Sequence, residues 1–115
     1  MRIEVSSGEL IDKITILEIK DERVKDEDKL LNIRHELDVL LKYEFETTHK
    51  HDLKQVNNTL WDLEDGIRNL EKVEDFGVDF IDKARNIYKF NDERARIKKL
   101  INLEQCSDIV EEKSY

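Results

Sequence analysis

The 115-residue sequence contains no proline, three glycines, one cysteine and only 7% aromatic residues. A β-sandwich or β-barrel needs many turn residues and β-branched strands, so this composition argues against those folds. The single cysteine, Cys106, excludes an intramolecular disulfide and a CxxC metal or redox motif. No uninterrupted apolar run is long enough to span a membrane, and no signal-like segment opens the sequence, so we expect a cytoplasmic protein.

Charged residues are abundant. They make up 42% of the chain, and 28 acidic against 20 basic side chains give a formal net charge of −8. Such a field repels nucleic-acid backbones and anionic lipid unless a basic patch overrides it. The longest basic cluster, Arg94 to Lys99, is interleaved with apolar residues and follows Glu93, which is typical of a solvated helix flank. We therefore expect neither a nucleic-acid nor a membrane partner.

Apolar spacing predicts an all-α fold, a compact bundle of about four helices within a single domain, residues 1–115. The third helix has the most regular pattern, with apolar residues three and four apart from Leu53 to Leu70. Short extended segments are expected at both termini, and the tail from Ser107 is compatible with pairing to residues 1–5 or with a loose end. The predicted helices cover approximately residues 7–24, 27–45, 52–74 and 78–103.

Local signals mark two of the helix starts. Ser6 to Glu9 reads as a capping box, in which the Ser6 hydroxyl accepts from the Glu9 amide while the Glu9 carboxylate reaches back. Asp26 is a suitable N-cap for the second helix. Gly66 falls inside the third helix, where it costs roughly 1 kcal/mol relative to alanine.

Polar residues interrupt several apolar faces. The first helix is apolar nearly all round, so we expect it to be central, and Glu18 and Asp21 fall within its main apolar sector. Two buried carboxylates need cations or water. The matching positions on the third and fourth helices predict that these acids meet some of Arg68, Arg94 and Lys98, with Asn57, Tyr88 and Asn91 as neutral hydrogen-bonding neighbours.

This predicted cluster has two interpretations. It is either a structural ion-pair network that fixes helix register or a polar pocket whose cations hold an anionic small molecule. No metal site is predicted, and His49 and His51 read as a solvated loop. Carboxylates such as Glu64 distantly resemble the magnesium-binding acids of all-α nucleotide pyrophosphatases, so magnesium is a cofactor only under the pocket interpretation. The candidate ligand-binding residues are Glu18, Asp21, Trp61, Glu64, Arg68, Tyr88, Asn91, Arg94 and Lys98.

Four strings stand out, namely VSSGELIDKITILEIK at residues 5–20, NNTLWDLEDGIR at residues 57–68, ARNIYKFNDERARIKKLIN at residues 84–102 and the terminal VEEKSY. Together they resemble a bacterial family of short proteins of unknown function. The resemblance covers nearly the whole chain. It implies no activity, cofactor or site residues.

Two functional hypotheses follow. The first is a non-enzymatic helical protein that binds itself, as a homodimer, or a protein partner through apolar surface left over after the helices pack, with the second helix and the Trp61 flank as contact surfaces. The alternative is a small-molecule-binding protein or enzyme that acts on a phosphorylated or nucleotide-linked sugar through the central charged pocket.

Overall fold

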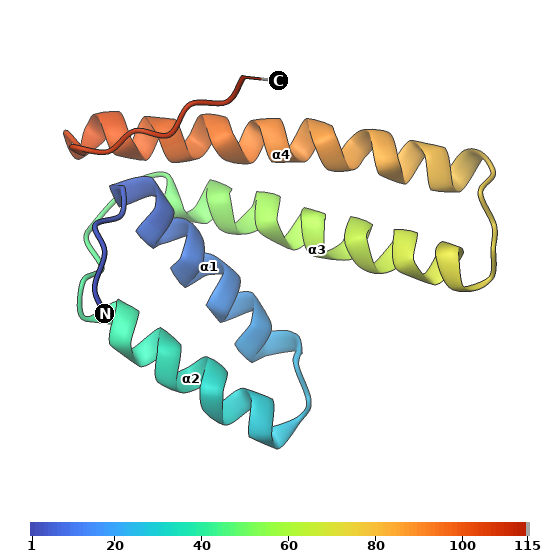
Figure 1. Cartoon of the computed structure of the whole chain (residues 1–115), viewed down its shortest axis with the longest axis horizontal. Coiled ribbons are helices and arrows are strands. Elements are labelled where there is room, and N and C mark those ends of the chain that lie inside the picture. The colour runs from blue at the N-terminus through green and yellow to red at the C-terminus, as the bar shows by residue number, and fades with distance from the viewer. Residues whose placement is uncertain (115) are drawn as a thin grey trace.

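A computed structural model describes residues 1–114, which form four α-helices and no strand. The helices are α1 (Ser7–Arg23), α2 (Glu27–Leu41), α3 (Lys50–Lys72) and α4 (Val78–Glu104). Figure 1 shows α3 and α4 lying side by side as an antiparallel hairpin, with α1 and α2 packed toward one end of it. The predicted all-α bundle is therefore confirmed. Within residues 1–114, none of the helices combines the length and apolar character needed to cross a membrane.

The observed helix ends differ from the predicted ones by a few residues. The largest difference is in α2, which ends at Leu41 rather than near residue 45, because the Tyr43 and Glu44 amides turn back to the Leu40 and Leu41 carbonyls. As predicted, the Asp26 carboxylate caps α2 by accepting from the Lys29 amide at 3.0 Å.

The capping box that opens α1 is only half formed. The Ser6 hydroxyl accepts from the Glu9 amide at 3.1 Å, as predicted. The Glu9 carboxylate does not return to the backbone of Ser6. It accepts instead from the Lys98 ammonium group at 2.7 Å. A residue that satisfies a local pattern is thus drawn into a contact between α1 and α4.

α1 is the central helix, as its apolar character predicts. It contacts each of the other three helices, whereas α2 contacts α1 alone. Leu30 is the one buried residue of α2. The main core lies where α1 meets the α3–α4 hairpin, and its buried members are Ile11, Ile14, Leu53, Val56, Leu60, Ile97 and Ile101.

One half of the α3–α4 hairpin has little cover. The buried residues of α3 all lie between Leu53 and Leu60, and those of α4 all lie between Ile97 and Asn102. Toward the turn that joins the two helices, the hairpin extends beyond α1 and α2 (Figure 1). The radius of gyration is 15.8 Å, against about 13 Å for a compact domain of this length. The free part of the hairpin accounts for this elongation.

The carboxyl-terminal tail returns along α4 (Figure 1). Residues 107–114 have no helical structure, yet Glu112 and Lys113 form ion pairs with α4, with Lys99 at 2.8 Å and with Asp92 at 2.6 Å. The tail is therefore neither paired as a strand with residues 1–5 nor a loose end. Tyr115, the last residue of the terminal string, lies outside the described residues.

Candidate functional site

A buried carboxylate, Asp12, forms the centre of a polar cluster between α1, α3 and α4. Its side chain is 1% exposed. The Arg94 guanidinium of α4 donates to both carboxylate oxygens, from Nε to Oδ1 at 2.9 Å and from Nη2 to Oδ2. The Asn57 amide of α3 donates to Asp12 Oδ1 and to Thr15 Oγ1, each at 2.9 Å. Three helices are thus joined through one acidic side chain.

Lys98 lies one turn beyond Arg94 and extends the cluster. Its Nζ lies 2.7 Å from the Glu9 carboxylate and 3.9 Å from that of Asp12. The pKa of Arg94 is raised by its hydrogen bonds to Asp12, with partial burial opposing and the charges of Asp12 and Glu9 adding to the rise. Acids of α1 therefore favour the charged form of the Arg94 guanidinium.

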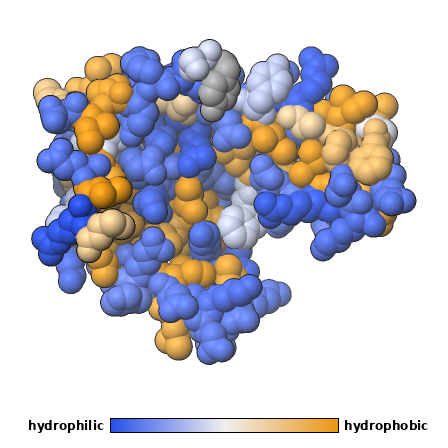
Figure 2. All heavy atoms as spheres, in the orientation of Figure 1, coloured by the Kyte–Doolittle hydropathy of each residue, from blue (hydrophilic) through white to orange (hydrophobic). Residues whose placement is uncertain are grey.

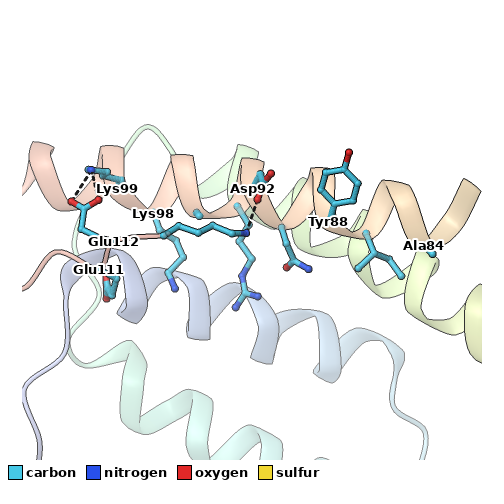
Figure 3. A pocket seen from close by; sticks show the side chains of 12 residues that line it. Ala84, Tyr88, Asp92, Lys98, Lys99, Glu111 and Glu112 are labelled. Carbon is cyan, nitrogen blue, oxygen red and sulfur yellow. Dashed lines mark hydrogen bonds and ion pairs between the residues drawn. The ribbon is translucent and has the colours of Figure 1, made fainter. Parts of the chain in front are cut away.

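The tail closes the amino-terminal end of the cluster. The Glu111 carboxylate accepts hydrogen bonds from the Ser6 hydroxyl and, at 3.1 Å, from the Asn102 amide. Partial burial raises the pKa of Glu111, but these hydrogen bonds, one from its own backbone and the charge of Lys98 outweigh it, so the pKa lies below the ordinary 4.5. Figure 3 shows Lys98 and Glu111 directed toward α1.

Close approach of two backbones positions these side chains. The Gly8 amide donates to the Asn102 side-chain oxygen at 2.6 Å. A Cβ atom at Gly8 would collide with the Lys98 backbone carbonyl oxygen. Glycine is therefore the residue that lets the start of α1 approach the end of α4 this closely. The contact sets the height at which Glu9 and Asp12 meet their basic partners.

Two surface grooves adjoin the cluster. The tail groove has a volume of about 660 Å³ and lies between the middle of α4 and the tail (Figure 3). The Trp61 groove has a volume of about 290 Å³ and lies between α1, α3 and α4, with Ile16, Ile19, Leu60 and Trp61 as its apolar lining. Asn91 and Arg94 line both grooves. The Arg94 side chain therefore connects the buried acid to two hollows on the surface.

Seven of the nine residues predicted from sequence lie around these grooves. The expectation that Asn57, Trp61, Glu64 and Arg68 share one side of the third helix is confirmed, because all four line the Trp61 groove. Arg68 lies at its exposed rim, 3.9 Å from Glu64. Tyr88 and Lys98 line the tail groove, and Asn91 and Arg94 belong to both grooves. Their role in ligand binding stays a prediction.

The predicted partners of Glu18 and Asp21 are wrong. Glu18 pairs with Lys50 at 3.1 Å and with Lys54 at 3.7 Å, both on α3. Asp21 pairs with Arg34 of α2 at 2.7 Å. A helix that is apolar on every side has no single inward direction, so the main apolar sector does not identify the face that meets α4.

The acids that do meet α4 were missed in the sequence. With Leu10 at zero and about 100° per residue, Asp12 projects at about 200°, between Ile19 and Ile16 on what looks like the back of α1. A signal was present, because Gly8 and Thr15 flank Asp12 at i−4 and i+3. Small residues at helical spacing indicate the face that another helix approaches closely. Glu9, Asn102 and Glu111 gave no comparable signal.

The acidic and basic side chains of the cluster neutralise one another. Arg94 forms an ion pair with Asp12, Lys98 with Glu9, and Lys99 with Glu112. An anionic ligand in either groove would compete with carboxylates already in place, which disfavours anion capture. Among residues 1–114, no three His, Cys, Asp or Glu side chains are arranged to hold a metal ion.

Comparisons with known proteins add a family and nothing on activity. No curated protein and no solved structure matches the chain. A family model described as a family of unknown function, DUF6165, matches residues 1–115. The resemblance of the four strings to a family of unknown function is thereby confirmed, and the chain belongs to the DUF6165 family.

Proposed function

We propose that this protein acts by self-association, as a homodimer that buries the free half of the α3–α4 hairpin. The expected setting of this dimer is the cytoplasm of a bacterium. The proposal needs no catalytic step and no cofactor. The proposal agrees with the ion pairs of Arg94 and Lys98, because cations that are already paired join the helices rather than bind a ligand.

Excess surface is the observation that carries the proposal. The chain exposes 8123 Å², whereas a compact protein of 13.8 kDa exposes about 6,600 Å². A stable protein–protein interface takes about 800 Å² from each partner. The excess of about 1,500 Å² therefore exceeds what each chain would contribute to a dimer.

The composition of the free hairpin supports the same location. Five apolar side chains near the turn and on α4 are each more than half exposed, namely Val73, Phe76, Val78, Ile81 and Tyr88. Figure 2 shows apolar side chains gathered at this end of the molecule. An exposed, contiguous apolar surface of this kind is typical of an association site. Two such hairpins can bury their seams against each other as a four-helix bundle.

This location differs from the contact surfaces expected from sequence. On α2, Leu37 and Leu40 pack against the core and leave Leu31 as its most exposed leucine. Trp61 is partly buried, and the Arg23 guanidinium lies 5.7 Å from the centre of its ring. On α2, Leu31 is the one large apolar residue that is more than half exposed, against five near the turn and on α4. We therefore assign the interface to α3 and α4.

Sedimentation equilibrium over micromolar concentrations tests the proposal. The wild-type chain is expected to show the mass of a dimer, and Ile81→Glu is expected to shift it toward the monomer, because a carboxylate would be buried in the interface. Leu103→Glu is the matched control, since Leu103 is similarly exposed on α4 but lies beyond the free half of the hairpin. A wild-type chain that remains monomeric throughout would contradict the proposal. Dissociation by Leu31→Glu instead would move the interface to α2.

A further inference from the structure

α4 carries a second stripe of residues, separate from the seam that packs against α3 and α1. Its members recur at alternating spacings of three and four, which is the heptad pattern of a helix that pairs with another helix. Ile81, Ala84 and Tyr88 are exposed, and Asn91 and Ala95 are partly buried in the tail groove. The stripe thus runs from the free end of the hairpin into an open hollow.

The side chains along this stripe fit an antiparallel copy of α4. Ala84 and Ala95 are small and lie near its two ends, whereas Tyr88 and Asn91 lie between them. When two copies are related by a two-fold axis beside Tyr88 and Asn91, Tyr88 of each faces Asn91 of the other, and Ala84 faces Ala95. The bulky residues then occupy the centre and the alanines permit close approach on both sides. The tail groove supplies about 660 Å³ into which the second copy can enter.

The charges beside the stripe are complementary to themselves in this register. Arg85 and Asp92 are seven residues apart, so they lie on the same flank of α4 and about 10.5 Å apart along its axis. The same two-fold axis brings Arg85 of each copy within about 3 Å, along the helix axis, of the level of Asp92 of the other. Within residues 1–114, Arg85 has no ion pair, and Asp92 pairs with Lys113 at 2.6 Å. The dimer would contain the Arg85–Asp92 ion pair twice.

We propose that two copies of this chain pair through antiparallel α4 helices, with the stripe from Ile81 to Ala95 as the seam and reciprocal Arg85–Asp92 ion pairs on its flank. This inference rests on the proposed function, since it specifies the register of the dimer proposed above. A second copy is the occupant, rather than an unrelated helix, because one flank supplies both charges of the pair. The register also determines which residues of one copy face which residues of the other.

Charge exchange between two variants tests the register. Arg85→Glu and Asp92→Arg each place like charges opposite one another at two positions of a homodimer, and each is expected to raise the dissociation constant about tenfold. In an equimolar mixture, every Arg85→Glu chain faces an Asp92→Arg chain with opposite charges at both positions. The mixture is therefore expected to recover wild-type affinity, as a heterodimer resolved by tagging one variant.

Two controls separate the register from other effects. Lys42→Glu makes the same charge change as Arg85→Glu just beyond the end of α2, and it is expected to leave association unchanged. Lys113→Ala removes the tail contact that Asp92→Arg also disturbs, and it is expected not to reproduce the weakening caused by Asp92→Arg.

The possible outcomes distinguish the two proposals. Recovery in the mixture, with both controls silent, supports the register. If the wild-type chain forms a dimer that Ile81→Glu disrupts but the exchange variants bind as the wild type does, or the mixture fails to recover, the register is wrong and self-association through the hairpin stands. If the wild-type chain is monomeric, both proposals fail.

Discussion

Removal of the Asp12 carboxylate should destabilise the fold strongly, because three helices depend on it. Asp12→Ala leaves the Arg94 guanidinium without its acceptor and leaves the Asn57 amide with Thr15 Oγ1 as its remaining acceptor. Breaking a buried pair from one side costs about 3–5 kcal/mol. The Arg94 side chain is 31% exposed, so water can reach part of the freed cation, and we expect a loss of about 2–4 kcal/mol. The total stability of a domain is about 5–15 kcal/mol.

Removal of the basic partner, Arg94, should reduce the free energy of unfolding more than removal of Asp12. Arg94→Ala leaves a carboxylate that is 1% exposed, with Lys98 at 3.9 Å as the nearest remaining cation. A carboxylate that water cannot reach loses more than a guanidinium at a groove wall, so the expected loss is about 3–5 kcal/mol. Urea denaturation measures both losses through the midpoint, with the slope unchanged if the native state keeps its shape.

An exposed ion pair gives the control for this comparison. Glu93 and Arg96 pair on the surface of α4. Glu93→Ala is expected to change the free energy of unfolding by less than about 1 kcal/mol. A loss below about 1 kcal/mol for Asp12→Ala, or a smaller loss for Arg94→Ala than for Asp12→Ala, would refute the reasoning from burial.

Three further changes give opposed or pH-dependent results. Gly8→Ala should destabilise the protein by about 1–3 kcal/mol in urea melts, because the added methyl group meets a backbone carbonyl that cannot move. Gly66→Ala should be neutral or stabilising by up to about 1 kcal/mol, because its methyl group meets only the flexible Lys83 side chain; a large loss would contradict this. The lowered pKa of Glu111 stabilises the folded state above the ordinary value of 4.5, and this stabilisation is lost as the pH falls through the folded pKa. The stability difference between wild type and Glu111→Gln should therefore vanish at acidic pH, and a difference that persists there would exclude this cause.

The fold could be predicted from sequence because its signals are local. The spacing from Leu53 to Leu70 indicates one helix, and the Asp26 carboxylate caps α2 at its predicted start. These features depend on residues within one or two turns of each other. The length of the α3–α4 hairpin that extends past α1 could not be predicted in this way. It depends on where α1 packs along the hairpin, which is a tertiary contact.

The sequence predicted the basic residues of the candidate site but not their acidic partners. Arg94 and Lys98 were recognised because they interrupt a clear apolar stripe on α4. Their acidic partners could not be assigned by the same rule, since α1 is apolar all round and the helical phase alone does not say which face meets α4. Only the rotation of α1 about its axis distinguishes Asp12 from Glu18. Tertiary packing sets that rotation, and the small residues Gly8 and Thr15 are its local signal in the sequence.

The attachment of α2 to α1 alone gives the molecule a gradient of local stability. With Leu30 as its single buried residue, α2 can detach while α1 keeps its contacts with the hairpin. Such an opening costs less than global unfolding, so amide protons of α2 should exchange with deuterium sooner than those of α1. The protein would then unfold in two cooperative units. Proteolytic nicking under native conditions should accordingly begin in the segments on either side of α2.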